Sequence, residues 1–378
     1  MSEFRAGIVG AGFVGQIHAE TLRRLGNVSV VAIADVAGAK AAAERMKIPS
    51  YYADYREMID SAKLDVVHIC TPNRSHCEIA MYALGHGANI LCEKPMTTSI
   101  RDAEALVEQV EKSGLVAALN FHNRFYPMTH HMRNVIRDGE LGGVFSVTGS
   151  YTQDWLLEKT DYSWRLLSEE SGKTRAVADI GSHWMDLAEY VSGQTITEVL
   201  ADFSIIHPVR KKPLRHTSAY STEKFSDDGY EDMRVDTEDN ANILIRFGNG
   251  AKGSVFVSQV IAGKSVAISL LVGGYKKSAE WNSENCNKLV IGRKDSFCEL
   301  LEKGPTTVHP DTLPLVAYPL GHLEGFPDAF KQCFRQVYAS IGDAAAPRDY
   351  ATVKDGLHEV VLCERIFESN QRQQWVRV

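Results

Sequence analysis

The feature that most constrains this chain lies near its N-terminus, where a short apolar run leads into three glycines. The run FRAGIV is followed by Gly10, Gly12 and Gly15 at the spacing G-x-G-x-x-G, and then by a helix-forming segment. Glycines at this spacing allow a tight turn, the approach of a diphosphate to the backbone and close packing of the helix on the strand. Asp35 lies twenty positions after Gly15, at the end of the next apolar run. A carboxylate there accepts hydrogen bonds from an adenosine ribose and repels a 2′-phosphate, so the sequence predicts a Rossmann domain that binds NAD, with NADP disfavoured.

The rest of the first third of the chain repeats this alternation of strand-like and helix-like segments. Strand-like apolar runs occur at 4–10, 28–35, 64–72, 88–95 and 115–121. Strands that alternate with helices at this spacing are typical of a parallel sheet built from βαβ units. After about residue 121, longer runs of β character appear, with a hairpin signal at Asn249-Gly250, and two helices close the chain. We therefore expect an α/β fold with a Rossmann domain over 1–120, and an α+β domain with a large, open, mostly antiparallel sheet over 121–378.

Composition and charge narrow the class of protein further. A length of 378 residues suggests two domains, and 44% apolar with 24% charged residues is ordinary for a globular protein. The net charge is −7 without a long Lys/Arg block, which argues against nucleic acid or membrane partners. A basic stretch at 207–212 is followed by an acidic one at 227–239, and we interpret both as a solvated loop.

The cysteines and the N-terminal sequence bear on the cellular compartment. Seven cysteines without a C-x-x-C pair argue against a disulfide framework and against a zinc ribbon, and no metal site is predicted. The N-terminus lacks the pattern of a signal peptide, and no apolar run is long enough to span a membrane. The expected compartment is the cytoplasm.

A second unusual segment is AVADIGSHWMDLAEY at 176–190, an apolar run that carries Asp179, His183 and Asp186. Spacings of four and three residues place these side chains on one face of a helix. A buried stripe of carboxylates and imidazole is costly unless its members pair with one another or with a ligand. The segment is therefore either a satisfied structural network or part of an active site. Two alternatives stay open within it: Asp179 as a helix N-cap, and Asp186 in a salt bridge on the helix face.

Three further stretches accompany the glycine motif: CTPNRSH (70–76), LCEKPM (91–96) and DIGSHWMD (179–186). Together they resemble the glucose–fructose oxidoreductase/inositol dehydrogenase/MocA (Gfo/Idh/MocA) family over essentially the whole chain. The resemblance implies a Rossmann domain followed by a mixed-sheet domain, with the active site in the cleft between them. It also implies that Lys94 is catalytic and that Asp179 and His183 act with it on a substrate hydroxyl. YTQDWLL (151–157), Trp164-Arg165 and GHLEGFPDAF (321–330) resemble members that oxidise pyranose sugars or anhydrosugars.

The same residues make chemical sense for the oxidation of a secondary alcohol. His183 is a natural base near neutral pH, and Asp179 one turn earlier orients the imidazole and stabilises its cation. Lys94 follows a parallel strand, at the sheet edge where ligands bind, and its ammonium stabilises an alkoxide. The alternatives are a solvated surface lysine, a satisfied buried histidine, and, for Trp155 and Trp164, core aromatics rather than a face for a polyhydroxylated ring.

The candidate residues fall into three groups. The predicted catalytic residues are Lys94, Asp179 and His183. The predicted cofactor-binding residues are Gly10, Gly12, Phe13, Val14, Asp35, Thr71, Asn73, His76, Glu93 and Asn120. The predicted substrate-binding residues are Gln153, Trp155, Trp164, Arg165, Asp186 and His322. His76 is open between capping its helix and touching the nicotinamide side of the cofactor, whereas His18, His130 and His131 are interpreted as ordinary helix histidines.

The functional hypothesis is NAD-dependent oxidation of a secondary hydroxyl in a sugar, anhydrosugar or cyclitol. One alternative is a redox-neutral glycoside hydrolase or epimerase that retains NAD through its cycle. Another is a non-catalytic NAD-binding sensor, against which the presence of Lys94, Asp179 and His183 together counts. The open sheet of the second domain needs a cover, and family members commonly form oligomers through it, so we expect a homodimer or homotetramer.

Overall fold

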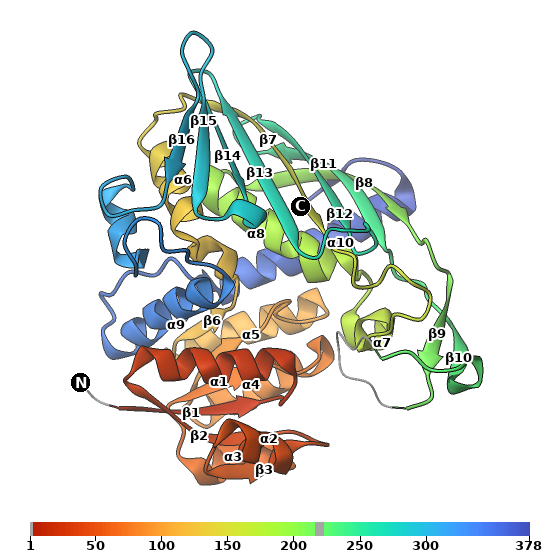
Figure 1. The fold of residues 1–378 in the computed structure, drawn as a ribbon. Helices are drawn as coiled ribbons and strands as arrows, with labels where there is room; N and C mark the ends of the chain where they lie inside the picture. Colours follow the sequence, from red (N-terminus) through yellow and green to blue (C-terminus); the bar gives the residue numbers. More distant parts are fainter. Residues whose placement is uncertain (1–2, 216–222) are drawn as a thin grey trace. The chain divides into compact units, whose positions relative to one another are not determined.

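The computed structural model describes residues 3–215 and 223–378, and it divides into two compact units (Figure 1). The first unit comprises residues 3–122 and Phe330–Val360, and the second comprises the described residues of Asn123–Ala329 together with Val361–Val378. Local sequence patterns placed everything after residue 120 in the second domain, because periodicity carries no information about which sheet a late helix joins. Helices α9 (Phe326–Gly342) and α10 (Val353–Arg372) each pass from residues of one unit to residues of the other.

The first unit is built on a seven-stranded sheet with the strand order β17-β6-β5-β4-β1-β2-β3. Every pair is parallel except β17 with β6. The strands are β1 (Phe4–Val9), β2 (Val28–Ala34), β3 (Ser50–Tyr52), β4 (Val66–Ile69), β5 (Asn89–Cys92), β6 (Ala117–Leu119) and β17 (Ala351–Thr352). The intervening helices are α1 (Phe13–Leu25), α2 (Ala39–Met46), α3 (Tyr55–Ala62), α4 (His76–Gly85) and α5 (Ile100–Ser113). The order of the first six strands is that of a Rossmann fold, which confirms the expected fold class.

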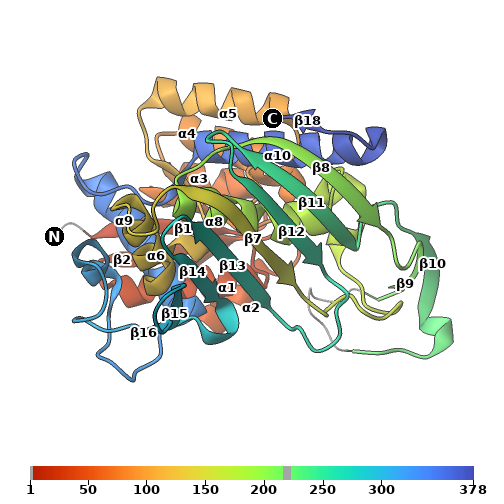
Figure 2. The ribbon, with the colours of Figure 1, turned by 90° about the horizontal axis from the view of Figure 1, so that it is seen from above.

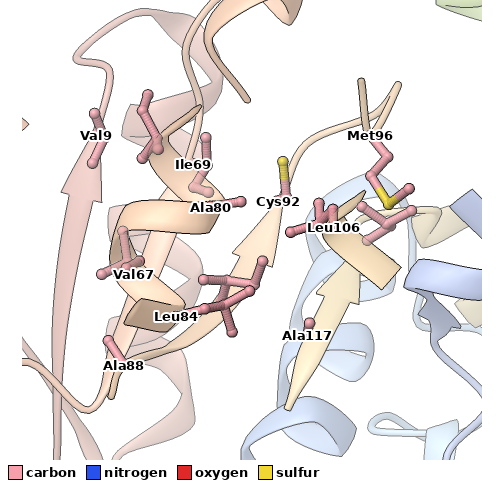
Figure 3. Packing of buried hydrophobic residues seen from close by; sticks show 14 of the residues in the cluster. Val9, Val67, Ile69, Ala80, Leu84, Ala88, Cys92, Met96, Leu106 and Ala117 are labelled. Atoms are coloured by element: carbon pink, nitrogen blue, oxygen red, sulfur yellow. The ribbon is translucent and has the colours of Figure 1, made fainter. Parts of the chain in front are cut away.

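The core of this unit explains why its strands read as continuous apolar runs. Figure 3 shows Val67 and Ile69 of β4 packed with Ala80 and Leu84 of α4, while Leu106 of α5 belongs to the same buried cluster. Strands covered on both faces bury every side chain, and each buried Leu or Ile contributes about 1.5–3 kcal/mol. This packing fixes the carboxyl ends of β1, β4 and β5 at one edge of the sheet, where ligands bind in folds of this type.

The second unit is built on a nine-stranded sheet with the order β16-β15-β14-β13-β7-β12-β11-β8-β18 (Figure 2). Its neighbours are antiparallel except for β7 with β12, as expected for a mostly antiparallel sheet. The strands are β7 (Val144–Thr152), β8 (Ile196–Ser204), β11 (Asn240–Phe247), β12 (Lys252–Ser258), β13 (Ala267–Gly274), β14 (Ser278–Asn282), β15 (Lys288–Gly292), β16 (Glu299–Glu302) and β18 (Val376–Arg377). The predicted Asn249-Gly250 turn joins β11 to β12, with Gly250 at a φ of 87°.

Helices cover one face of this sheet. Helix α8 (Ser182–Ser192) packs against β7 and β13, and α6 (Pro127–Arg137) packs against α8, β14 and β15. The short helix α7 spans Ser168–Ser171. None of the helices within residues 3–215 and 223–378 is long and apolar enough to cross a membrane.

The stretch 207–237 contains a two-stranded ribbon, which Figure 2 shows apart from the large sheet. Strand β9 (Val209–Pro213) pairs antiparallel with β10 (Tyr230–Arg234). The expected solvated loop is wrong for Arg210 and for Asp239 at the end of the acidic stretch, because both side chains are fully buried and paired with each other. It holds for Lys211 and Lys212, which make exposed pairs with Asp232 and Glu231. Residues 216–222 of this stretch lie outside the described residues.

Candidate functional site

The three glycines after β1 each meet a different steric demand. Gly10 has a φ of +100°, and a β-carbon on it would lie 2.6 Å from the carbonyl oxygen of Cys70. A β-carbon on Gly15 would lie 2.0 Å from the carbonyl oxygen of Gly10, so only glycine allows α1 to pack this closely on the turn. A β-carbon on Gly12 would meet nothing within 4 Å, which leaves the backbone open on that side.

The opening at Gly12 suits a diphosphate. Gly12 precedes α1, and no side chain in the described part of the chain caps the N-terminus of that helix. Uncapped N–H groups and the positive end of the helix dipole bind phosphate oxygens. Phe13 and Val14, which the sequence assigned to the cofactor, are the first two residues of α1.

Asp35 follows β2 and organises the adjacent turn. Its Oδ2 accepts a hydrogen bond from the backbone N–H of Ala11 at 2.8 Å, and its Oδ1 accepts from Ala37 and Gly38 at 2.9 Å each. A carboxylate has acceptor capacity for about four hydrogen bonds, so capacity for a ribose hydroxyl is left. The carboxylate is therefore held beside the glycine turn, as expected for an adenosine ribose site.

Substitution of Asp35 tests this assignment. We expect Asp35→Ala to lower the ratio of kcat/KM for NAD over NADP by about 10- to 100-fold, since the carboxylate neither binds the ribose nor repels a 2′-phosphate. Asp35→Asn is the matched control, because it removes the charge while its amide oxygen keeps the hydrogen bonds from Ala37 and Gly38 and loses only the one from Ala11. The measurement is kcat/KM with both cofactors. An unchanged preference in both variants would place the ribose elsewhere.

The residues that follow β4 form the next part of the candidate site. Thr71 and Asn73 lie in the connection to α4, and His76 is the first residue of that helix. His76 Nε2 lies 2.8 Å from the carbonyl oxygen of Thr71, and its Nδ1 lies 2.8 Å from that of Pro95. Burial lowers the pKa of His76, whereas the two carbonyls act in the opposite direction. The ring therefore joins the loop after β4 to the loop after β5, a bridging role that neither sequence-based alternative included.

Glu93 and Lys94 directly follow β5. Glu93 Oε1 accepts hydrogen bonds from Asn120 Nδ2 at 2.6 Å and from His18 Nε2, whose distance is 3.0 Å. Burial alone would raise the pKa of Glu93, but His18, Asn120 and the charge of Lys94 lower it to about 2. The Oδ1 of Asn120 is buried without a hydrogen-bond partner among the described residues. This spare acceptor and the open backbone at Gly12 fit a dinucleotide laid across the carboxyl ends of these strands.

The second unit holds Asp179 in a π-helical turn, Val177–Gly181, that runs directly into α8. Asp179 Oδ1 accepts from Arg165 Nε at 3.1 Å, and its Oδ2 accepts from Gln259 Nε2 at 2.8 Å. The N-cap alternative for Asp179 is not what the structure contains, because neither this turn nor α8 has a side-chain cap among the described residues, and the carboxylate of Glu238 accepts the backbone N–H groups of Arg175 and Val177. His183 lies in the first turn of α8 and is buried. Single π-turns inside helices are frequent at functional sites.

Aromatic residues surround the partner of Asp179. The Arg165 guanidinium lies 4.5 Å from the ring centre of Trp164 and 5.8 Å from that of Trp155. Trp155 Nε1 donates to Gln153 Oε1 at 2.7 Å. Both tryptophans are half-buried, and Trp155 also packs against a small buried cluster that includes Leu156 and Leu166. The structure thus brings Gln153, Trp155, Trp164, Arg165 and Asp179 together, and we call these five residues the aromatic–polar cluster.

Asp186 and His322, which are also predicted to bind substrate, have contacts with residues outside the aromatic–polar cluster. Both carboxylate oxygens of Asp186 accept from Arg124 Nε, at 3.0 and 2.9 Å, which is the salt-bridge alternative. His322 lies on a loop shaped by Lys303, whose ammonium donates to the carbonyl oxygen of His322 and to Glu324. The ring of His322 lies 3.4 Å from the carbonyl oxygen of Leu320 in the same loop. Both sets of contacts lie within the second unit, and the roles of Asp186 and His322 in substrate binding stay predictions.

Several residues of the site were missed at the sequence level. His18, interpreted as an ordinary helix histidine, is fully buried and bonded to Glu93, and Gln259 holds Asp179. The separations are 75 residues for His18 and Glu93 and 80 for Gln259 and Asp179. A single sequence offers no local signal for pairings at such distances.

Two family models match the chain. The model described as "Oxidoreductase family, NAD-binding Rossmann fold" of the Gfo/Idh/MocA family matches residues 4–121. The model of the Gfo/Idh/MocA C-terminal domain matches residues 129–280. The two matches follow each other along the chain and together span more than half of it.

Individual relatives are similar over different lengths. Levoglucosan dehydrogenase of Pseudarthrobacter phenanthrenivorans is 26% identical over 100% of this chain and 99% of its own. D-glucoside 3-dehydrogenase of Escherichia coli is 32% identical, over 51% of this chain and 55% of its own. The solved structure of levoglucosan dehydrogenase in complex with NADH and levoglucosan has a TM-score of 0.89 at 25% identity, over 100% of both chains.

Proposed function

This chain belongs to the Gfo/Idh/MocA oxidoreductase family, and from that premise we propose that it is an NAD-dependent dehydrogenase of a secondary hydroxyl in a sugar, anhydrosugar or cyclitol. The observation that carries the proposal is the likeness, over the full length of both chains, to a levoglucosan dehydrogenase solved with NADH and levoglucosan. The aromatic–polar cluster supports it, because indole faces with adjoining amide and carboxylate groups suit a ring that carries many hydroxyls.

Residues of the first unit would hold NAD. The glycine turn, with Gly10, Gly12, Phe13 and Val14, receives the diphosphate, and Asp35 receives the adenosine ribose. The nicotinamide half falls to the residues that follow β4, β5 and β6, namely Thr71, Asn73, His76, Glu93 and Asn120. Bound NAD would supply the acceptor for the hydride that leaves the carbinol carbon.

The proton chemistry falls to three side chains of this protein. Lys94 donates a hydrogen bond to the reacting oxygen and stabilises the negative charge that develops on it. His183 takes up the hydroxyl proton, a role that contributes on the order of 10²- to 10⁴-fold in rate. Asp179 is held by Arg165 and Gln259, and its charge stabilises the imidazolium that His183 becomes. Gln153, Trp155, Trp164 and Arg165 bind the sugar ring.

The proposal is tested by measuring NADH formation over a panel of polyols with NAD and with NADP. The panel includes myo- and scyllo-inositol, glucose, xylose, levoglucosan and methyl glucosides. Net reduction of NAD by one class of polyol is the expected result and identifies the substrate class. Cleavage or epimerisation of a glycoside without net NADH would instead support a redox-neutral enzyme. Tight NAD binding with no reaction across the panel would favour a sensor.

We also propose that the protein forms a homodimer or homotetramer through the uncovered face of the second-unit sheet. The strand register places Leu244 of β11, Leu271 of β13, Val290 of β15 and Leu300 of β16 in one row, and therefore on one face. All four are exposed, between 36% and 61%. The same row also contains Ser254, Thr148 and Glu280. Exposed apolar residues that recur across a sheet among polar ones are typical of a self-association surface.

A charge in this row should separate the subunits. We expect Leu271→Glu to convert the oligomer to monomer in sedimentation velocity at micromolar concentration, because a buried unpaired carboxylate costs several kcal/mol. Phe297→Glu is the matched control, since Phe297 is 80% exposed and lies between β15 and β16, outside the row. A wild-type protein that sediments as a monomer at that concentration would contradict the proposal.

A further inference from the structure

A chain of hydrogen bonds crosses the interior of the first unit and ends at Glu93. Tyr338 of α9 has its hydroxyl oxygen 2.9 Å from His68 Nε2, and His68 Nδ1 lies 2.9 Å from His18 Nδ1. The His18 Nε2 lies 3.0 Å from Glu93 Oε1. His18 and His68 are fully buried, and Tyr338 is nearly so. Three elements, β4, α1 and α9, therefore converge on the carboxylate that precedes Lys94.

All the hydrogen bonds in this chain donate in one direction, from Tyr338 toward Glu93, and the hydrogen-bond partner of each group shows where its proton lies. Among the described residues the Tyr338 hydroxyl has only the His68 Nε2 as a hydrogen-bond partner, so it donates there and His68 carries its proton on Nδ1. The His68 Nδ1 then donates to the His18 Nδ1, and the His18 Nε2 donates to the ionised Glu93. Every donor in this assignment has an acceptor, as buried polar groups require.

Burial and charge agree with the assignment. Burial keeps the pKa of His68 well below its ordinary value, so its ring is neutral. Burial likewise keeps the pKa of the Tyr338 hydroxyl well above its ordinary value, so it stays a donor. His68 and Tyr338 are thus in the protonation states that the one-directional arrangement needs.

We propose that His18, His68 and Tyr338 are positioning residues that hold Glu93 as a carboxylate of fixed orientation for the nicotinamide half of NAD. The inference rests on the proposed function, since it gives Glu93 a cofactor to contact. The carboxylate favours a cationic nicotinamide ring and accepts hydrogen bonds from ribose hydroxyls. Protonation removes the charge and leaves a weaker acceptor.

Other titratable groups face Glu93 from the surrounding elements. They are His18 of α1, Cys70 after β4, His76 of α4, Cys92 at the end of β5, Lys94 beside it, and His122 after β6. Burial raises the pKa of both thiols and lowers the pKa of His122 to about 4. The thiols and His122 therefore keep their charge state between pH 5 and pH 8.

The test is the dissociation constant of NAD, measured by calorimetry between pH 5 and pH 8. In the wild type, the pKa of Glu93 of about 2 leaves its charge constant over this range. His18→Leu removes one hydrogen-bond donor to the buried Glu93, so the pKa of Glu93 rises. We therefore expect the affinity of this variant for NAD to fall by about fivefold or more from pH 8 to pH 5. His18→Gln keeps a donor toward Glu93 and should restore the flat profile. His18→Leu combined with Glu93→Gln should bind weakly at every pH.

The matched packing control is Phe334→Leu. Phe334 packs its ring against His18 and His68, with ring centres 4.7 and 5.2 Å apart, and takes no part in the hydrogen-bond chain. We expect a lower melting temperature and a flat pH profile. A flat profile in His18→Leu, or a pH-dependent one in Phe334→Leu, would overturn the inference.

If His18→Leu does not fold, Tyr338→Phe takes its place as the test. We expect a smaller change in NAD affinity in the same direction, and a flat profile would overturn the inference. A wild type that binds no NAD at any pH refutes the proposed function instead.

Discussion

Replacement of Lys94 by alanine should lower kcat by about 10³-fold and change the dissociation constant of NAD by less than about threefold. The rate falls because the reacting oxygen loses the ammonium that donates to it and stabilises its developing charge. Cofactor affinity is largely kept, because the backbone around Lys94 is held by other residues. Glu93 stays bonded to His18 and Asn120, and Pro95 accepts from His76. The measurement is steady-state kinetics with the sugar identified by the panel, together with NAD binding by calorimetry.

Lys94→Arg separates charge from placement. Arginine keeps a positive charge but spreads it over a planar group that cannot take the place of a compact ammonium, so we expect a defect almost as large as that of alanine. Partial rescue of Lys94→Ala by added small alkylamines, without rescue of Lys94→Arg, would identify the ammonium as the missing group. A loss of NAD affinity that parallels the loss of rate would make Lys94 a cofactor-binding residue instead.

The features of the fold that were predictable are those with a local cause. The strands of the first unit were recognisable because burial on both faces leaves continuous apolar runs, and the three glycines because each has a steric reason within one turn. The short strand β3 and helix α3 were not assigned, and neither was the place of residues 330–360 in the first unit. The place of residues 330–360 depends on packing between residues that are hundreds of positions apart in the sequence. Val353 and Val360, for example, lie in the core of the first unit.

The residues of the candidate site were likewise predictable only where the cause of their placement is local in the sequence. The aromatic–polar cluster was predictable in part, because Trp164 and Arg165 are neighbours in sequence and Gln153 is close to Trp155. Gln259 carried no signal, since a glutamine after a strand is ordinary in any sequence. The role of Asp186 was ambiguous for the opposite reason: a carboxylate on a helix face suits a substrate or an ion pair equally well, and only the structure shows the ion pair with Arg124.

The solvated-loop interpretation of the stretches 207–212 and 227–239 was wrong for Arg210 and Asp239, because charge alone does not report burial. Asp239 Oδ1 accepts from Arg175 Nη2 at 2.5 Å and from Arg210 Nη2 at 2.7 Å, and all three side chains are fully buried. Arg175 also donates to Gln259 Oε1 at 3.0 Å, and Gln259 donates to Asp179. The ribbon β9–β10 is thereby connected to the candidate catalytic carboxylate through one continuous set of hydrogen bonds.

Asp239→Ala should therefore destabilise the protein more than any other single change considered, by about 3–5 kcal/mol, because it leaves two buried guanidinium groups without their shared carboxylate. Arg210→Met is the matched control: it keeps the Arg175–Asp239 pair and should cost less. The measurement is the free energy of unfolding from urea denaturation. We also expect the folded fraction of Asp239→Ala to have a lower kcat, since Arg175 no longer fixes Gln259 against Asp179.

The pH dependence of this loss has a definite sign. Burial alone would raise the pKa of Asp239, but Arg175 and Arg210 lower it below its ordinary value of 3.8. A carboxylate whose pKa is lower in the folded state contributes stability that is fully present above its unfolded pKa and is lost as pH falls toward the folded one. Burial of Glu238 raises its pKa, so its protonation acts in the opposite direction in both proteins.

The difference in unfolding free energy between wild type and Asp239→Ala should consequently be constant from pH 8 to about pH 5 and shrink below about pH 4, where the unfolded carboxylate becomes protonated. Because Glu238 is present in both proteins, its contribution cancels to first order in this difference. A difference that grows on acidification would mean that Asp239 takes up its proton more readily in the folded protein. Its burial, and not its two arginines, would then control its charge.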